Sequence, residues 1–118
     1  MTTTPLDLSQ PIRSLRLHTG LTYAAAAARL APPGHPHPST GLVTRPESYG
    51  PGVRVCTVVR FARAWGCPVE VRLGRRVLAW PEEGLDVSVR DLVTMGELWG
   101  ATVAVEVAVP APAAAQNS

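Results

Sequence analysis

Histidine and cysteine are the residues of this sequence best suited to bind a metal ion. Two of the three histidines, His35 and His37, stand in the segment Gly-His-Pro-His-Pro, and His18 lies further upstream. The prolines spread that segment and no acidic or thiol ligand has a suitable spacing, which favours a solvated loop over a metal site. Cys56 and Cys67 form no C-x-x-C pair. This favours two small buried thiols, with a disulfide or a metal site as the alternative.

An acidic cluster could supply the paired carboxylates of acid–base catalysis. It consists of Glu82, Glu83 and Asp86, which follow Trp80 and precede a predicted helix. Acidic residues interact favourably with the dipole at the start of a helix, and that structural role accounts for them. No Ser or Cys nucleophile has a recognisable base nearby, and no glycine-rich phosphate loop is present. The sequence therefore predicts no catalytic residue, no metal, no cofactor and no enzymatic activity.

The positive charges are unevenly distributed along the chain. All 11 are arginine, which together with the abundant Ala, Pro, Gly and Val indicates a GC-rich genome rather than a function. Residues 1–76 have a net charge of +7 and residues 77–118 a net charge of −5, which together give the +2 of the whole chain. Such a division is expected when one end of a protein meets phosphates and the other does not. It also permits head-to-tail self-association.

Length and hydropathy limit the class of protein further. A chain of 118 residues with 46% hydrophobic residues fits one folded domain, with or without a small appendage. No apolar run approaches the roughly 20 residues that a membrane-spanning helix needs. The start, MTTTPLDLSQ, has no basic segment followed by an apolar stretch, so no secretory signal is visible. We therefore expect a cytoplasmic protein that does not contact a membrane.

Helix signals dominate the first part of the chain. After a lead at residues 1–8 that we expect to be flexible, Ser9 can cap a helix that ends at Gly20. Thr22 can cap a second helix over residues 23–30. The run of five alanines in that second helix favours helix formation and lets a neighbouring helix approach closely.

A proline-rich segment separates these helices from the rest of the chain. Residues 31–41 read APPGHPHPSTG and are predicted to form a loop, because proline disrupts the hydrogen bonding of both helix and sheet. A short helix is predicted over residues 42–48, and Pro46 inside it limits its length. Gly50-Pro51-Gly52 marks a second break.

Two segments of the remaining sequence repeat each other at an offset of 34 residues. Residues 53–73 and 87–107 each have apolar residues at helical spacing, a glycine that stops the helix and an alternating strand. Ser88 and Asp91 form a capping box for the second helix. We interpret the repeat as two packing units, either an old duplication or two helices that obey the same packing rule. The matching positions are Val53/Val87, Val55/Val89, Val59/Val93, Trp65/Trp99, Gly66/Gly100, Val69/Val103 and Val71/Val105.

The three tryptophans could stack on nucleic-acid bases or fill the core. Trp65 and Trp99 recur at the ends of the two predicted helices, which favours the core for both. Trp80 is left open between the two roles.

Alternating residues predict a small sheet. The stretch VEVRLGRRVLAW gives two strands about Gly74-Arg75, which is a hairpin signal. Residues 103–109 give a third strand, which the hairpin needs because a lone hairpin is rarely stable in water. The tail at residues 110–118 has low complexity and is predicted to be disordered.

These signals together predict an α+β protein. A helical bundle of three to four helices is expected to precede a small antiparallel sheet of about three strands with one further helix. The expected division is a helical domain at residues 9–67, a β-α-β extension at residues 68–109 and the tail at residues 110–118.

Three stretches of the N-terminal half carry a family pattern. They read IRSLRLHTGLTYAAAAARLA, STGLVTRPESYGPG and VRVCTVVRFARAWG. The chain resembles the Cro and λ-repressor family of helix-turn-helix domains, also called XRE-like, over residues 9–67. The first stretch is similar to the opening helix of the family, its Gly-Leu-Thr junction and a second helix with a small residue, Ala27, where two helices touch. The second stretch corresponds to the recognition helix and the third to the closing helix.

The resemblance implies sequence-specific binding of double-stranded DNA by a transcriptional regulator, similar to a phage repressor or an antitoxin. A recognition helix contacts base edges in the major groove, and arginine and hydroxyl side chains suit that contact. Phosphates are bound by side chains and by the N-terminal amides of the second helix. The implied base contacts are Ser39, Thr40, Thr44 and Arg45, and the implied phosphate contacts are Thr22, Tyr23, Arg29 and Arg54.

The middle stretch departs from the family pattern. Residues 32–38 lengthen the turn before the recognition helix, Tyr23 stands where a phosphate-binding glutamine is common, and Pro46 interrupts the helix. These departures support a second hypothesis, in which the chain is a protein–protein adaptor or structural subunit that keeps the scaffold without reading DNA. The partner of such an adaptor is expected to bind the acidic C-terminal half.

The valine-rich sheet half is the expected dimerisation surface. Strand pairing across a two-fold axis completes a sheet that is too small alone. The same axis places two recognition helices about one DNA turn apart, roughly 34 Å. The sequence therefore predicts a homodimer.

Overall fold

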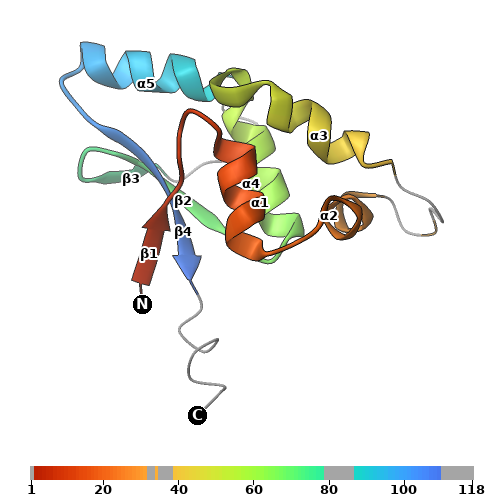
Figure 1. Ribbon diagram of the computed structural model, residues 1–118. Helices are drawn as coiled ribbons and strands as arrows, with labels where there is room; N and C mark the ends of the chain where they lie inside the picture. Colours follow the sequence, from red (N-terminus) through yellow and green to blue (C-terminus); the bar gives the residue numbers. More distant parts are fainter. Residues whose placement is uncertain (1, 32–33, 35–38, 79–86, 110–118) are drawn as a thin grey trace.

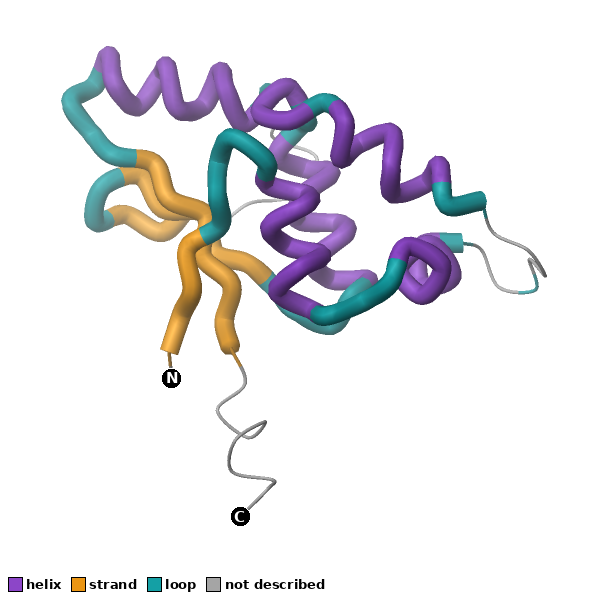
Figure 2. The backbone as a smooth tube through the Cα atoms, viewed as in Figure 1, coloured by secondary structure: helices purple, strands orange, loops and turns teal. Residues whose placement is uncertain are grey.

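Figure 2 shows the strands gathered on one side of the molecule and the first four helices on the other. The computed structural model describes residues 2–31, 34, 39–78 and 87–109. It confirms the α+β class, with five α-helices and four strands in these residues. In chain order (Figure 1) the elements are β1 (Thr2–Pro5), α1 (Pro11–Thr19), α2 (Tyr23–Leu30), α3 (Gly41–Ser48), the 3-10 helix η1 (Gly50–Gly52), α4 (Val55–Ala64), β2 (Val69–Leu73), β3 (Arg76–Leu78), α5 (Val89–Leu98) and β4 (Val103–Val109).

The first helix begins later than the sequence predicted. α1 starts at Pro11, and its N-cap residue, Gln10, makes no side-chain capping bond. The predicted cap, Ser9, instead donates hydrogen bonds from its amide and its hydroxyl to Asp7 Oδ1, at 3.0 and 2.6 Å. An ionised carboxylate is a strong acceptor, and it therefore holds the Ser9 hydroxyl away from the helix. Gly20 ends α1 as predicted, in the left-handed region at φ 73°.

The next two helices follow their sequence signals. Thr22 caps α2 by accepting a hydrogen bond from a backbone amide of the first turn at 3.1 Å. Ala26 and Ala27 are fully buried, as expected of small residues at a helix–helix contact. Pro46 lies inside α3, where it removes one backbone donor. The helix ends soon after it, and the Tyr49 amide binds the Pro46 carbonyl at 3.2 Å.

The sheet is antiparallel and has the strand order β1-β4-β2-β3. The predicted hairpin is present, because β2 and β3 pair about Gly74-Arg75. β4 pairs with β2 on one side and with β1 on the other. The strand β1 corrects the prediction of a flexible lead at residues 1–8: it is paired along its whole length, and the Leu6 amide that follows it binds the Val105 carbonyl at 2.8 Å. An N-terminal segment that pairs with an unpaired sheet edge gains these hydrogen bonds, and no local sequence pattern predicts such pairing.

The two repeat units pair with each other through equivalent residues. Arg54 forms an isolated bridge with Ser88, and Val71 lies opposite Val105 between β2 and β4. Both pairs consist of positions that match at the offset of 34 residues. Antiparallel pairing centred on equivalent residues is the arrangement that a two-fold axis produces. The two helix–strand units are therefore related by an approximate two-fold axis within one chain.

The two units differ in what covers the end of their helix. Trp65 is 2% exposed, and its indole N–H donates to the Ala26 carbonyl of α2 at 3.1 Å. Trp99 is 63% exposed and its neighbour Leu98 is 80% exposed. The prediction of a core position is therefore right for Trp65 and wrong for Trp99, because α1 and α2 pack against α4, whereas α5 packs against η1 and β4. Trp80 lies outside the described residues.

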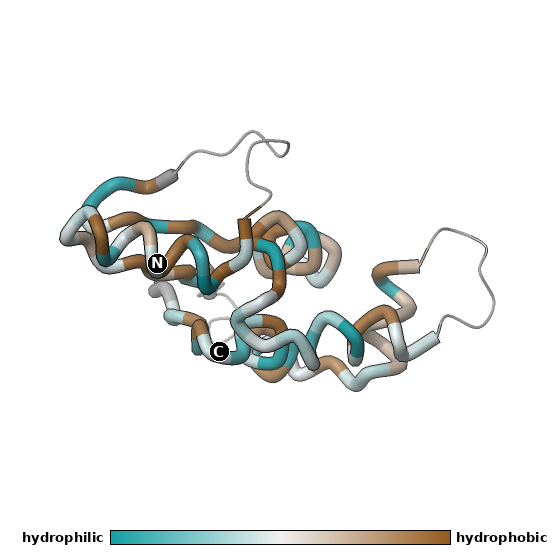
Figure 3. The backbone as a smooth tube through the Cα atoms, turned by 90° about the horizontal axis from the view of Figure 1, so that it is seen from above, coloured by the Kyte–Doolittle hydropathy of each residue, from teal (hydrophilic) through white to brown (hydrophobic). Residues whose placement is uncertain are grey.

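One cluster of buried side chains joins the helices to the sheet. Hydrophobic and hydrophilic residues alternate along the helices, as the interleaved colours of Figure 3 show. The core includes residues on both sides of the expected boundary between residues 67 and 68. The division of the chain into two parts stays a prediction. The tail at residues 110–118 lies outside the described residues. No helix in the described part of the chain is long and apolar enough to cross a membrane. The largest fully buried side chains are Pro11, Ile12, Leu15, Val43, Val55, Val58, Val89, Val105 and Val107.

A glycine in α5 gives a test of the close contact between this helix and the sheet. A Cβ atom at Gly96 would lie 2.7 Å from Val103 Cγ2 and 3.0 Å from the Ala101 carbonyl oxygen. Alanine is favoured over glycine inside a helix by about 1 kcal/mol. We nevertheless expect Gly96→Ala to lower the free energy of unfolding by about 1–3 kcal/mol, because the added methyl group overlaps the strand. Urea unfolding followed by circular dichroism measures the change.

The matched control is Gly52→Ala. A Cβ atom there lies 3.5 Å from Arg90 Nη2, which is an ordinary contact with the end of a flexible side chain. We expect its effect to stay within about 0.5 kcal/mol. A stabilising effect of Gly96→Ala would contradict the close approach of α5 to β4.

Candidate nucleic-acid interface

Three side chains from three helices hold α3 in place. Arg16 Nε of α1 lies 3.1 Å from Glu47 Oε2 of α3, and the Tyr23 hydroxyl of α2 donates to Glu47 Oε1 at 2.6 Å. The Arg16 guanidinium also lies over the Tyr23 ring, 4.0 Å from its centroid. The Arg16 and Glu47 side chains are 12% and 14% exposed, so that solvent screens their attraction weakly. This network links α3 to the other two helices.

The buried side of α3 determines which of its residues point outward. Val43 is fully buried and belongs to the common core. Since an α-helix turns by about 100° per residue, Arg45 and Ser48 lie on the opposite side of α3 and Thr44 lies on its flank. All three of these residues are exposed. α3 therefore presents hydroxyl groups and a guanidinium to solvent.

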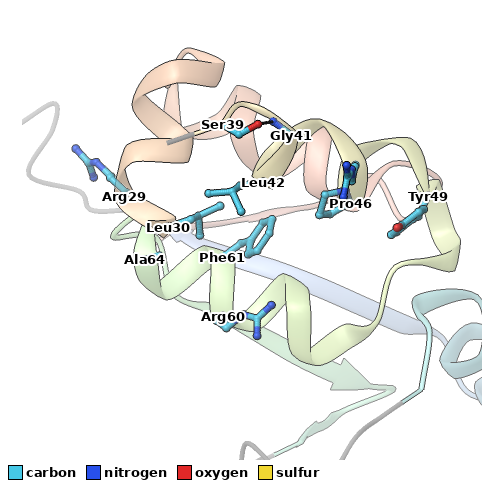
Figure 4. Close-up of a pocket in the computed structure, with 11 residues that line it drawn as sticks. Arg29, Leu30, Ser39, Gly41, Leu42, Pro46, Tyr49, Arg60, Phe61 and Ala64 are labelled. Carbon is cyan, nitrogen blue, oxygen red and sulfur yellow. Dashed lines mark hydrogen bonds between the residues drawn. The ribbon is translucent and has the colours of Figure 1, made fainter. Parts of the chain in front are cut away.

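Two hollows flank α3. The hollow on the α1 side has a volume of about 500 Å³ and is lined by Arg13 and Thr44, among others. The hollow on the α4 side has a volume of about 730 Å³ and is lined by Leu42 and Arg45, among others (Figure 4). The outward face of α3 consequently stands between two depressions. A helix that projects in this way has the shape that enters the major groove of DNA.

Two of the four predicted base-contact residues, Ser39 and Thr40, come just before α3, and the other two, Thr44 and Arg45, lie within it. Thr40, Thr44 and Arg45 are exposed, and Thr40 makes no side-chain capping bond. The Ser39 hydroxyl accepts a hydrogen bond from the Gly41 amide at 3.1 Å. Ser39 thus orders the entry to the helix, which leaves the two threonines and the arginine as the side chains that face outward.

The four predicted phosphate-contact residues are spread over the helices. Thr22 and Tyr23 stand at the start of α2, where the Thr22 side chain caps the helix and the Tyr23 hydroxyl is bonded to Glu47. Arg29 lies at the other end of α2, and its Nη1 donates to the Trp65 carbonyl at 3.4 Å. Arg54 is exposed at the N-cap of α4. The structure therefore brings Thr22 and Tyr23 together and places Arg29 and Arg54 elsewhere.

Sequence reasoning missed three charged residues of this region. Arg13 is exposed on α1 and lines the hollow next to Thr44, which adds a cation beside α3. Arg16 and Glu47 are 31 residues apart, and no local pattern links them. One signal was present: Arg16 stands four residues after the buried Ile12, on the flank of the helix face that packs inward.

The turn between β1 and α1 holds an ionised carboxylate at the surface. The hydroxyl and the amide of Ser9 both donate to Asp7, and they lower the pKa of that carboxyl below its ordinary value. The Asp7 amide in turn donates to the Ser14 hydroxyl of α1 at 3.1 Å. Asp7 therefore has a structural role, as a clamp between the first strand and the first helix.

The candidates for metal binding lie partly within the described part of the chain. There, no group of three or more His, Cys, Asp or Glu side chains is placed to hold a metal ion. Cys56 and Cys67 are free thiols, and they are half-buried rather than buried as predicted, because Cys56 lies beside the buried face of α4 and Cys67 just beyond its end. The histidines of residues 35–37 and the acidic cluster of residues 82–86 lie outside the described residues.

No protein-family model, no curated protein and no solved structure matches the chain. The features of the chain that bear on its function are the geometry of α1 to α4 and the charges around them.

The Glu47 network gives a stability prediction. We expect Glu47→Gln to lower the free energy of unfolding by about 1–3 kcal/mol, because it leaves the shielded Arg16 guanidinium without its charged partner. Amide hydrogen exchange of residues 41–48 should accelerate more than that of α4, since α3 loses its link to α1. Guanidinium chloride unfolding and exchange measured by NMR provide the two readouts.

Glu70→Gln is the control for this change of charge. Glu70 forms an ion pair of the same 3.1 Å length with Arg72, but the two side chains are 46% and 36% exposed. Removal of such a surface pair changes stability by about 0.5 kcal/mol or less. Equal effects of the two substitutions would show that the Glu47 network does not hold α3.

Proposed function

We propose that the chain is a cytoplasmic, non-enzymatic transcriptional regulator that binds double-stranded DNA with α3 in the major groove. The observation that carries the proposal is the position of α3. It projects between two hollows, its outward face carries Thr44 and Arg45, and the Glu47 network holds it to α1 and α2. Rigid attachment of the inserted helix is what base reading requires.

The chemistry of the outward face suits base edges. A guanidinium such as that of Arg45 can pair bidentately with guanine, and the hydroxyls of Thr40 and Thr44 can donate or accept. The backbone amides at the start of α2, next to Thr22, are suited to a phosphate. Arg13 beside α3 and Arg54 at the start of α4 supply further positive charge for the DNA backbone.

Substitution of two arginines separates base reading from phosphate binding. We expect Arg45→Ala to lower the affinity for a specific duplex by about 5- to 150-fold and to leave non-specific binding nearly unchanged, because a base contact is lost. We expect Arg54→Ala to weaken specific and non-specific binding alike and to lower the salt slope by about one counterion. Titration of the duplex upstream of the chain's own gene, against salt and scrambled competitor, measures both.

Arg75→Ala is the control, because Arg75 is exposed in the β2–β3 turn, away from α3 (Figure 1). If the proposed face binds DNA, the Arg75→Ala variant should bind the specific duplex as selectively as the wild type. Binding that is unchanged by every arginine substitution in residues 39–54 would show that α3 is not the recognition helix.

A second candidate function, that of a protein–protein adaptor, is supported by the C-terminal end of α5. Leu98 and Trp99 expose 80% and 63% of their surface next to each other, and large apolar side chains of this kind mark interaction sites. Glu97 beside them is exposed and acidic. The sheet is already extended within one chain by β1, so we propose the α5 end, rather than a sheet edge, as the contact surface of a homodimer or a partner protein.

The oligomeric state tests this surface. We expect the protein to form a homodimer and the double substitution Leu98→Ser, Trp99→Ser to convert it to a monomer. The substitution should change the free energy of unfolding of the monomer by about 0.5 kcal/mol or less, because both side chains are exposed. Sedimentation equilibrium measures the mass. Val77→Ser, at another exposed apolar side chain, is the control. A wild-type protein that is monomeric at all concentrations would contradict the homodimer.

A further inference from the structure

The hollow between α2, α3 and α4 combines an apolar floor with a basic rim. Its volume of about 730 Å³ lies within the range of small-molecule sites in proteins. Each of the three helices contributes one arginine and at least one apolar side chain. The arginines are Arg29 of α2, Arg45 of α3 and Arg60 of α4, and the main apolar residues are Leu30, Leu42 and Phe61 in the same helix order.

The apolar side chains converge at the centre of the hollow. In Figure 4, Leu30, Leu42 and Phe61 point toward one another from their three helices. Phe61 is 5% exposed and forms the base, whereas Leu42 is 42% exposed at the mouth. A ligand with an apolar body would therefore remove from water a side chain that the fold leaves uncovered.

The rim carries positive charge without a matching negative charge. None of the described residues that line the hollow carries a carboxylate. Within the described part of the chain, Arg29, Arg45 and Arg60 are paired with no acidic side chain. The bond from Arg29 Nη1 to the Trp65 carbonyl orients one guanidinium and leaves its other N–H groups available. The three arginines among the lining residues place positive charge beside the hollow and favour an anion, which a guanidinium can bind by charge-assisted hydrogen bonds.

We propose that this hollow binds a small amphipathic anion, a carboxylate or phosphate ester whose apolar body covers Leu30, Leu42 and Phe61 and whose headgroup binds the arginines. An acyl chain and an aromatic ring share this chemistry. Arg45 belongs both to this hollow and to the outward face of α3. On the proposed DNA-binding function, the anion and DNA therefore compete for Arg45, and the ligand acts as an effector that releases DNA.

The first experiment measures binding by the full chain without DNA, so that its result does not depend on the proposed function. Decanoate and 1-naphthyl phosphate, each below its micellar concentration, are titrated by calorimetry and by backbone amide NMR. We expect at least one of them to bind saturably with one site and to shift amides of residues 29–31, 41–49 and 60–64. Decanoate represents the acyl source and 1-naphthyl phosphate the aromatic source.

Two further probes separate the contributions of charge and apolar body. Decyltrimethylammonium reverses the charge, and inorganic phosphate has no apolar body. We expect both to bind at least tenfold more weakly than the better amphipathic anion. If decyltrimethylammonium bound as tightly as the amphipathic anion, the hollow would be only an apolar patch. If inorganic phosphate bound as tightly, the hollow would be only a binding surface for phosphates such as those of DNA. Either result overturns the proposal, as does the absence of saturable binding.

Variants locate the site on the protein. We expect Arg60→Gln and Leu42→Asp each to weaken the binding of the anion by about tenfold or more, since one removes a rim charge and the other places a carboxylate at the mouth. Both positions are exposed, and circular dichroism confirms that the variants fold. Arg75→Gln, outside the hollow, is expected to bind as the wild type does. Loss in all three variants, or in none, contradicts the site.

Competition with DNA is tested last. The anion should displace duplex DNA from the wild-type protein and do so at about tenfold higher concentration from Arg60→Gln, which keeps Arg45. If the anion binds but DNA does not, the site stands and the proposed function fails. If DNA remains bound at saturating anion, the site stands and the effector role is overturned.

Discussion

The ion pair between Arg16 and Glu47 joins α1 to α3. In the sequence, the proline-rich segment separates these two helices. Val43 supplies apolar packing on the same side of α3, but apolar packing alone tolerates rotation and sliding of a short helix. The carboxylate of Glu47 contacts both the Arg16 guanidinium and the Tyr23 hydroxyl, and these directional bonds fix the orientation of α3. The base contacts proposed for Thr44 and Arg45 depend on this orientation, since a binding group must be held within about 0.5 Å of its productive position.

The two repeat units show how one packing scheme serves two purposes. Their pairing at Arg54/Ser88 and Val71/Val105 builds the interior of the sheet. The first unit also receives α1 and α2, which bury Trp65. The second receives no such pair from the described residues, and Trp99 is 63% exposed. The same sequence pattern therefore stabilises a bundle in one half and leaves a surface available for association in the other.

Local signals of the sequence predicted the structure well where the determining atoms lie within a few residues. Thr22 caps α2, Gly20 ends α1, and Gly74-Arg75 forms the hairpin turn. Contacts between distant segments were beyond such reasoning. The strand β1 exists because it pairs with the edge of β4, and Trp99 is exposed because no pair of the described helices covers it. Of the candidate site, the exposed hydroxyls and arginine of α3 could be anticipated, but the partner that orients them, Glu47, could be found only in three dimensions.

The pairing of β1 with β4 has a consequence for the order of folding during synthesis. Among the described elements β1 is synthesised first, and its partner strand β4 is synthesised last. The four helices of the bundle all precede residue 65, so they can pack while the second unit is still being translated. The sheet closes last, because its contacts join the most distant parts of the chain. Until β4 has been synthesised, β1 has no partner strand among the described elements.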